Sequence, residues 1–225
     1  MATMPAVTVM IVDDHPLFTK GLSALIGGNG TYAVVGEATN GADALRILGE
    51  KKPKLAIVDL NLGKEDGLDL IKAMKRETPE LIVLVLSMLE EGYYAERALA
   101  AGAQGYIMKE EVSETVFDAI RTVSSGKIWL SERERNRAVD RMVGNRSLGA
   151  NAMDSVKTLS DRQLQIFTLV GKGFAPAEIA DRLNVSTKTV ESHQYQIKIK
   201  LRCKSAQELR RLAIEWCSAS GRSAQ

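Results

Sequence analysis

The stretch Leu55-Ala56-Ile57-Val58-Asp59 decides the fold of the first half of this chain. Its first four residues are all apolar and do not alternate with polar ones, which predicts a short strand buried on both faces. Strands of this kind belong to parallel sheets covered by helices, and open α/β sheets carry their chemistry at the carboxyl ends of the strands. Asp59 is therefore expected at the functional edge of a parallel sheet.

Three other apolar segments run into polar residues in the same way. Residues 7–12 run into Asp13-Asp14, residues 81–86 run into Ser87, and residues 106–108 run into Lys109. The carboxyl ends of parallel strands meet at one edge of their sheet. The sequence therefore predicts that three carboxylates, a hydroxyl and an ammonium group gather around Asp59.

Helical patterns alternate with these strands. Apolar residues recur at helical spacing after each strand, and Gly or Pro residues end most of the helices. The predicted strands are 7–12, 32–38, 55–58, 81–87 and 105–108, the predicted helices follow them, and residues 61–66 are predicted as a loop. Because parallel crossovers are right-handed, five such units predict a five-stranded, doubly wound parallel sheet of flavodoxin-like type, with helices on both faces.

The last part of the chain reads as entirely helical. Ser160 with Gln163, and Ser205 with Glu208, have the spacing of capping boxes that open helices. Between them, a short helix over 176–183, a turn at 184–185 and a longer polar helix over 187–201 form a helix-turn-helix pattern. The sequence predicts a four-helix domain, preceded by a charged helical segment over 132–143 and a flexible linker over 144–154.

The charge of the chain is divided between its two halves. Residues 1–125 hold 12 Lys and Arg against 18 Asp and Glu, a balance of −6, whereas residues 156–217 hold 11 against 6, a balance of +5. This asymmetry indicates two domains with different partners, and the basic one is the candidate for nucleic acid.

Composition and cysteine usage favour a cytoplasmic protein without a membrane segment. No apolar run reaches the roughly 20 residues of a membrane span, and residues 1–7 lack the basic and apolar regions of a signal peptide. Cys203 and Cys217 have no CxxC spacing and no neighbouring histidine cluster. We expect two reduced thiols rather than a disulfide framework or a zinc site.

The predicted acidic edge suits phosphoryl chemistry. Two adjacent carboxylates, Asp13 and Asp14, with a third from Asp59, provide the hard oxygen ligands that Mg²⁺ prefers. Such an ion offsets the repulsion between a carboxylate and an incoming phosphoryl group. Lys109 is placed to pair with the phosphoryl group on Asp59, and Ser87 is placed to donate a hydrogen bond to it.

Residues 5–125 resemble a receiver domain of a two-component response regulator. The resemblance rests on Val-Asp-Asp-His at 12–15, Val-Asp-Leu-Asn at 58–61, Asp66-Gly67, Ser87 and Gly-Tyr-Ile-Met-Lys at 105–109. It implies Asp59 as the phosphoacceptor and places Asp13, Asp14, Asp59 and the main-chain carbonyl of Asn61 around Mg²⁺. It also implies Ser87 as the switch hydroxyl, Tyr106 as the switch aromatic residue and Lys109 as the counter-ion. Leu62-Gly63 replaces the family's common Met-Pro.

Residues 155–217 resemble a LuxR-type helix-turn-helix domain, so the whole chain resembles a NarL/FixJ-family response regulator. The matching segments include Leu159-Ser160-Asp161-Arg162, Glu178-Ile179-Ala180 and residues 188–193. In the predicted helix over 187–201, positions 188, 191, 192 and 195 share one polar face, while Val190 and Ile197 share an apolar one. The polar face is expected to read the major groove. The predicted DNA contacts are Lys188, Thr189, Glu191, Ser192, Tyr195, Lys198 and Lys200.

These expectations combine into a phosphorylation-dependent transcriptional regulator that is not an enzyme. A sensor histidine kinase or a small phosphodonor would phosphorylate Asp59, which would control homodimerisation or binding to double-stranded DNA. Two alternatives stay open at this point. One is a constitutive DNA-binding protein whose receiver only mediates dimerisation, and the other is a Mg²⁺-dependent phosphotransferase. The second would need a further acid/base carboxylate and a substrate cap, and neither is evident in the sequence.

Overall fold

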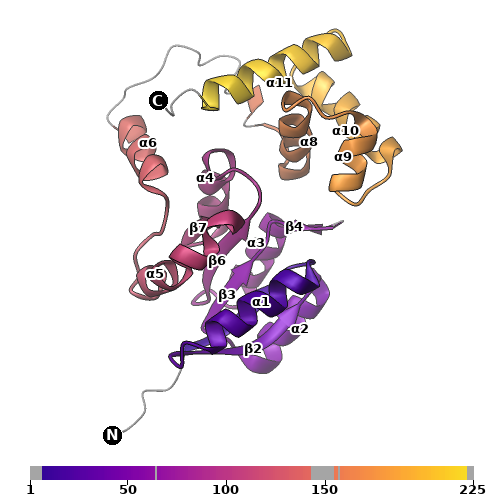
Figure 1. The fold of residues 1–225 in the computed structure, drawn as a ribbon. Helices are drawn as coiled ribbons and strands as arrows, with labels where there is room; N and C mark the ends of the chain where they lie inside the picture. The colour runs from indigo at the N-terminus through magenta and orange to yellow at the C-terminus, as the bar shows by residue number, and fades with distance from the viewer. Residues whose placement is uncertain (1–6, 64, 143–154, 157, 222–225) are drawn as a thin grey trace, which may run out of the picture. The chain divides into compact units, whose positions relative to one another are not determined.

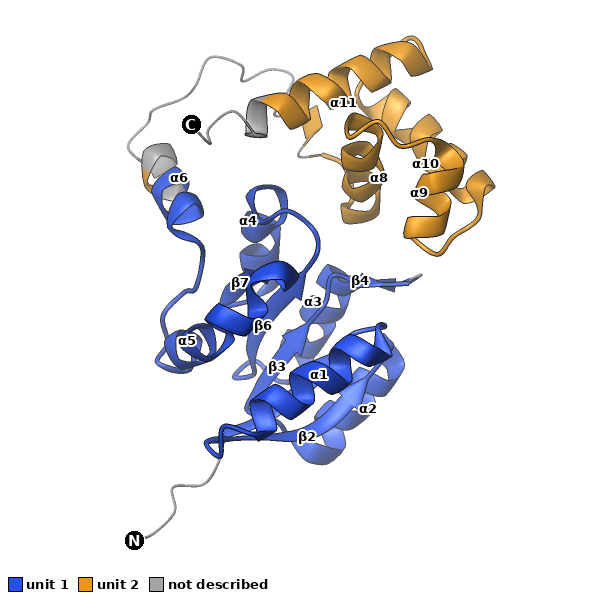
Figure 2. Cartoon of the chain, in the orientation of Figure 1, with its two compact units in different colours: residues 1–138 blue, residues 139–225 orange. Residues whose placement is uncertain are grey.

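The computed structural model describes residues 7–63, 65–142, 155–156 and 158–221 of the chain. The chain divides into two compact units, residues 1–138 and residues 139–225 (Figure 2). The predicted flexible linker over 144–154 lies outside the described residues. Among the helices that are described, none combines the length and the hydropathy that a membrane span requires.

The N-terminal unit is built on one parallel sheet, as predicted (Figure 1). Its strand order is β2-β1-β3-β6-β7, with every neighbouring pair parallel. The strands are β1 (Val7–Val12), β2 (Tyr32–Ala38), β3 (Leu55–Val58), β6 (Ile82–Ser87) and β7 (Gly105–Met108). In this order the topology reverses between β1 and β3, and it is at such a switch point that open α/β sheets bind ligands.

Five helices cover the two faces of this sheet. They are α1 (Pro16–Gly27), α2 (Gly41–Lys51), α3 (Gly67–Glu77), α4 (Glu91–Ala101) and α5 (Val112–Ser124). Helices α1 and α5 bury one face with alternate strand residues such as Ile11, Ile57 and Leu84. Because strand side chains alternate, Val12 and Val58 point to the other face, where they are also buried. Burial on both faces explains the uninterrupted apolar runs of the sequence.

Two short elements depart from the predicted pattern. Within the segment 61–66, predicted as a loop, β4 (Asn61–Leu62) and β5 (Glu65–Asp66) pair as antiparallel strands of a hairpin. A short 3₁₀ helix, η1 (Lys109–Glu111), also separates β7 from α5. Both elements are too short and too polar to give a periodic signal, which is why the sequence pattern does not reveal them.

Helix α6 (Glu132–Met142) follows the sheet, and residues before it remain attached to β7. The backbone N–H of Trp129 donates to the Gln104 carbonyl, and the Tyr106 N–H donates to the Trp129 carbonyl, both at 3.0 Å. Leu130 is buried. The sequence predicts residues 126–154 as a partly helical linker between the domains, and residues 129–130 of this segment lie beside the edge strand of the sheet.

Over residues 158–221, the described part of the C-terminal unit holds the four predicted helices: α8 (Asp161–Gly171), α9 (Pro176–Arg182), α10 (Thr187–Lys200) and α11 (Ala206–Gly221). The capping box of Ser160 and Gln163 is present. Ser205 caps α11, but the Glu208 carboxylate accepts from the Lys204 N–H at 2.6 Å rather than from Ser205. Phe167 and Trp216 join α8 to α11, with their ring centroids 5.6 Å apart.

The turn between α9 and α10 has the geometry that a helix-turn-helix requires. Asn184 adopts φ 48°, a left-handed conformation that asparagine tolerates better than most residues. Ser186 then caps α10, because its Oγ accepts from the Thr189 N–H at 3.1 Å. Val190 and Ile197 are buried, so the predicted apolar side of α10 faces the interior of the unit.

Candidate functional site

The carboxylate of Asp59 is held between an ammonium and a hydroxyl group. Lys109 Nζ lies 2.6 Å from Asp59 Oδ2, and the Ser87 hydroxyl donates to Asp59 Oδ1 at 2.9 Å. All three side chains are buried, and they come from the ends of β3, β6 and β7. The strand ends thus bring these three predicted residues together.

Lys109 is shared between two carboxylates. Its Nζ also lies 2.6 Å from Asp13 Oδ2, and it stands 4.6 Å from the centroid of the Phe18 ring. Burial alone would lower the pKa of Lys109, but Asp59 and Asp13 outweigh burial and raise it. The site therefore keeps a fixed positive charge beside Asp59.

Burial has the opposite consequence for Asp59. Desolvation raises the pKa of Asp59 above its ordinary value, and the attraction of Lys109 offsets this effect only in part. The Asn61 N–H donates to Asp59 Oδ1 at 3.1 Å and favours the ionised form. An ionised Asp59 is thus costly to hold in the folded protein, and additional positive charge at this edge would lower that cost.

The acidic group at this edge has the donors for a divalent cation. One ligand atom each from Asp13, Asp14, His15 and Asp59 lie within 4.8 Å of one another. Among the described residues, Asn61 Oδ1 is also buried without a hydrogen-bond partner. A cluster of hard oxygen atoms with an unsatisfied carbonyl-type oxygen beside it fits the ligand preference of Mg²⁺.

His15 is the member of this group to which the sequence motif assigned no role. Its Nδ1 lies 3.1 Å from Asp13 Oδ1 and 2.8 Å from Asp14 Oδ1. Its backbone N–H also donates to Asp13 Oδ1 at 2.9 Å. Its position directly after Asp13-Asp14, as the residue before α1, was the signal that the sequence offered.

Tyr106 lies on β7, and its ring is buried. Its hydroxyl donates to the Leu89 carbonyl at 2.6 Å, and the Leu89 N–H lies 3.4 Å from Ser87 Oγ. Leu89 belongs to the connection between β6 and α4. Ser87 and Tyr106 therefore both contact the same segment of backbone.

The predicted DNA-contact residues on α10 fall into two groups. Lys188, Glu191, Ser192 and Tyr195 are exposed, as their shared helix face requires. The remaining three are engaged within the unit: Thr189 Oγ1 lies 2.7 Å from Ser186 Oγ, Lys198 Nζ lies 5.7 Å from the Tyr195 ring centroid, and Lys200 Nζ donates to Gln163 Oε1 at 2.8 Å.

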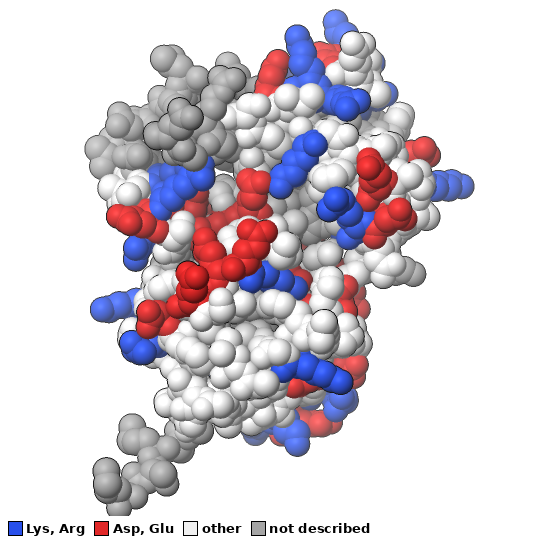
Figure 3. All heavy atoms as spheres, viewed as in Figure 1, with Lys and Arg blue, Asp and Glu red and all other residues white. Residues whose placement is uncertain are grey.

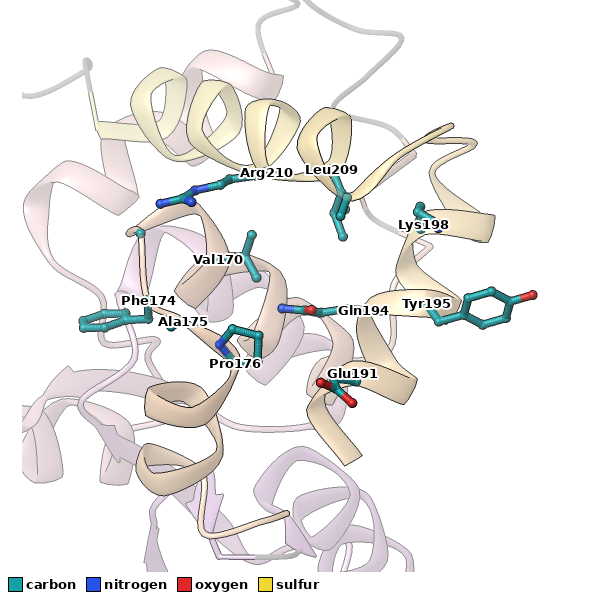
Figure 4. A pocket seen from close by; sticks show the side chains of 12 residues that line it. Val170, Phe174, Ala175, Pro176, Glu191, Gln194, Tyr195, Lys198, Leu209 and Arg210 are labelled. Carbon is teal, nitrogen blue, oxygen red and sulfur yellow. The ribbon is translucent and has the colours of Figure 1, made fainter. Parts of the chain in front are cut away.

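A cavity of about 440 Å³ opens beside α10 in the C-terminal unit. Figure 4 shows Gln194 pointing from α10 toward Pro176, whereas the Tyr195 side chain points away from this cavity. Adjacent residues of α10 therefore have different surroundings, and Tyr195, 61% exposed, remains available on the outer face. The charged side chains around the two units are visible in Figure 3, where acidic groups gather on the N-terminal unit.

A parallel sheet with this acidic edge, joined to a helix-turn-helix unit, defines a DNA-binding response regulator. Residues 9–121 match the response regulator receiver domain, and residues 157–213 match the luxR family of bacterial regulatory proteins. The chain belongs to the two-component response regulators with a LuxR-type DNA-binding domain. It is a transcriptional regulator controlled through its receiver and not an enzyme.

Individual relatives share both units. The chain is 35% identical over 209 residues to the oxygen regulatory protein NreC of Staphylococcus aureus strain JH9, covering 92% of this chain and 96% of NreC. A structure of the RcsB response regulator of Salmonella typhimurium is 26% identical, with a TM-score of 0.55, and covers 92% of this chain and 98% of that chain. A structure of two RcsB dimers bound to two parallel DNAs is 25% identical, with a TM-score of 0.55 and coverages of 92% and 97%.

Proposed function

We propose that Asp59 is the phosphoacceptor of this regulator and receives a phosphoryl group from a sensor histidine kinase or a small phosphodonor. The observation that carries this proposal is the pairing of Asp59 with Lys109 at 2.6 Å and with Ser87 at 2.9 Å. In the transfer, a carboxylate oxygen of Asp59 attacks phosphorus while the bond to the donor breaks. Lys109 then pairs with the added negative charge, and Ser87 donates a hydrogen bond to a phosphoryl oxygen.

Asp13, Asp14, Asp59 and the main-chain carbonyl of Asn61 would hold the Mg²⁺ ion that this chemistry uses. When bound, the ion neutralises charge on the carboxylates and on the phosphoryl group. Support comes from the close approach of the Asp13, Asp14 and Asp59 oxygen atoms. Lys109 lies 2.6 Å from Asp13 Oδ2 and 2.6 Å from Asp59 Oδ2, where its charge offsets the repulsion between the two carboxylates.

The contacts of Ser87 provide a route by which phosphorylation of Asp59 would change the structure beside the site. A phosphoryl group that takes the Ser87 hydroxyl withdraws it from the Leu89 N–H, 3.4 Å away. Leu89 also accepts the hydrogen bond of Tyr106, so a shift of this connection changes the surroundings of the tyrosine. We propose that Ser87 and Tyr106 transmit phosphorylation to α4 and the surface beside it in this way.

Helix α10 is the proposed DNA-reading element. Its exposed face offers Lys188 for phosphate attraction, Glu191 as an acceptor for a cytosine amino group, and Ser192 as an adaptable donor or acceptor. Thr189, Tyr195, Lys198 and Lys200 complete the proposed contact surface. Dimers suit two half-sites about one helical turn apart, and the RcsB dimers bound to DNA support a homodimer for this chain.

The test combines mass and DNA binding. Intact mass is measured after incubation with acetyl phosphate and Mg²⁺, for the natural sequence and for Asp59→Asn, followed by gel shifts on genomic fragments. We expect the gain of one phosphoryl group, its loss in Asp59→Asn, and tighter DNA binding by the phosphorylated protein. Firm DNA binding without any phosphoryl gain would instead support the constitutive alternative, in which the receiver only mediates dimerisation.

A further inference from the structure

Glu65 connects the hairpin of β4 and β5, which follows Asp59, to the start of α2. Glu65 Oε2 accepts a hydrogen bond of 2.6 Å from the backbone N–H of Gly41, the first residue of α2. The first N–H groups of a helix lack intrahelical partners and lie at the positive end of its dipole, so a carboxylate binds there favourably. Hairpin and helix are thereby joined by a charge-assisted hydrogen bond.

The contact depends on glycine at position 41. Gly41 is buried, and a Cβ atom there would lie 2.5 Å from Glu65 Oε2 and 3.5 Å from a methyl carbon of Leu70. The carboxylate occupies the space that any side chain would need. Asn40 meanwhile caps α2 through the Asp43 N–H at 2.9 Å, so Glu65 satisfies a donor that the local cap leaves available.

The same hairpin carries Asn61, whose backbone N–H contacts Asp59. Glu65 pairs with Leu62 across the hairpin, and Asn61, next to Leu62, donates its N–H to Asp59 Oδ1 at 3.1 Å. Asn61 Oδ1 is buried beside the same site. The position of Glu65 therefore bears on the position of Asn61 relative to Asp59.

The contact from Glu65 holds the hairpin at a point away from its base. Gly63 adopts φ 62° at the tip, and glycine leaves that torsion far freer than a proline ring would. At the base, the Gly67 N–H donates to the Leu60 carbonyl at 3.0 Å, and Asp66 Oδ1 accepts from the Leu68 N–H at 2.9 Å, so the base of the hairpin is joined to the start of α3. The contact from Glu65 to Gly41 adds a restraint nearer the tip.

We propose that Glu65 is a positioning residue for the chemistry at Asp59: its contact with the N-terminus of α2 holds Asn61 in the place required for Mg²⁺ binding and for the phosphoryl group. This inference rests on the proposed function of Asp59. Glu65 touches no reacting atom, so its effect passes through the hairpin. Groups that orient metal-binding residues in this indirect way change metal affinity by about tenfold or more.

Three variants separate the effect of the contact from the effect of the charge. Glu65→Ala removes the carboxylate, and Gly41→Ala displaces it while leaving it intact. Glu65→Gln keeps an oxygen acceptor and loses the charge, so it should restore part of the contact. Glu50→Ala, which removes an exposed carboxylate from the far end of α2, is the matched control.

The experiment uses the full chain and three readouts: hydrogen exchange of the residue 61–62 amides, Mg²⁺ binding by calorimetry without phosphodonor, and phosphoryl uptake from acetyl phosphate. For Glu65→Ala and Gly41→Ala we expect faster exchange, Mg²⁺ binding weakened about tenfold, and uptake that needs correspondingly more Mg²⁺. Glu65→Gln should fall between these variants and the natural sequence, and Glu50→Ala should match the natural sequence.

The outcomes keep this inference distinct from the proposed function. Unchanged hydrogen exchange and unchanged Mg²⁺ binding in Glu65→Ala would overturn the positioning role, whatever the phosphorylation result. A natural sequence that takes up no phosphoryl group would refute the proposed function of Asp59. The exchange and calorimetry would still decide whether Glu65 positions the hairpin.

Discussion

The Tyr106 hydroxyl donates a 2.6 Å hydrogen bond to the carbonyl oxygen of Leu89, in the connection that leads from β6 into α4. The ring is 1% exposed, and burial raises the pKa of Tyr106 well above its usual value. The phenol therefore stays protonated and acts as a donor throughout the ordinary pH range. The Leu89 N–H also lies 3.4 Å from Ser87 Oγ. Leu89 therefore connects Tyr106 on β7 with Ser87 at the end of β6.

Tyr106→Phe should weaken this link without removing a group that reacts. The Leu89 carbonyl loses its partner, so we expect the free energy of unfolding of the N-terminal unit to fall by about 1 kcal/mol in urea denaturation. Phosphoryl uptake should persist, but the gain in DNA affinity on phosphorylation should shrink. Tyr32→Phe is the control, since the Tyr32 ring stacks on Phe117 with centroids 6.0 Å apart. Equal stability losses in both variants would contradict this assignment.

Asp59→Asn should stabilise the unphosphorylated receiver at neutral pH. Because the folded pKa of Asp59 is raised, the native state binds more protons than the unfolded state between the ordinary value of 3.8 and the raised one. Stability is therefore lost as pH rises through that window, and the ionised carboxylate remains costly above it. The variant avoids this cost, and Lys109 keeps Asp13 as its partner at 2.6 Å. We therefore expect the free energy of unfolding of Asp59→Asn to exceed that of the natural sequence at neutral pH.

The measurement is urea denaturation of both proteins from about pH 8 to about pH 4. The advantage of Asp59→Asn should shrink as pH falls toward the ordinary pKa of an aspartate, because Asp59 becomes neutral in the natural sequence as well. An advantage that grows on acidification would show that the sign is wrong. Asp69→Asn, at an exposed carboxylate on α3, supplies the comparison.

Glu91→Ala should loosen the start of α6. Glu91 Oε1 accepts from the Ser131 N–H at 2.9 Å, and Ser131 Oγ in turn accepts from the Glu134 N–H at 3.2 Å. Loss of such a capping contact costs about 1 kcal/mol, so the amides of residues 131–137 should exchange roughly fivefold faster. Glu114→Ala, on the exposed side of α5, should leave these rates unchanged. Identical exchange in the two variants would rule out Glu91 as the anchor of α6.

Much of the sheet and its acidic edge could be predicted because buried parallel strands give strong local signals. The apolar run ending at Asp59 fixes a strand, and parallel topology then brings Asp13, Ser87 and Lys109 to the same edge. The contact between Glu65 and Gly41 could not be predicted in this way. It joins residues 24 positions apart through one polar side chain, and neither hydrophobic periodicity nor a local cap indicates such a pairing.

The same limit applies to α10. Helical spacing correctly separates the exposed face of Lys188 and Glu191 from the buried Val190 and Ile197. Spacing does not reveal that the Lys200 ammonium is bound to Gln163 Oε1 at 2.8 Å on another helix. Long side chains choose partners across the tertiary structure, so a charge pattern alone overstates which cations are available to DNA.

Substitutions on α10 should separate phosphate attraction from base reading. Lys188→Ala should weaken binding to all sequences alike and reduce the slope of log affinity against log salt by about 1, because one phosphate contact is lost. Glu191→Ala should leave the slope nearly unchanged and relax preference at one base pair by about 1–3 kcal/mol.

Binding is measured by fluorescence anisotropy on a selected site and on its single-base variants, over a range of salt concentrations. Lys51→Ala, on the exposed end of α2, controls for net charge. If Lys51→Ala and Lys188→Ala lower the slope equally, the effect belongs to overall charge, and α10 is not the element that contacts DNA.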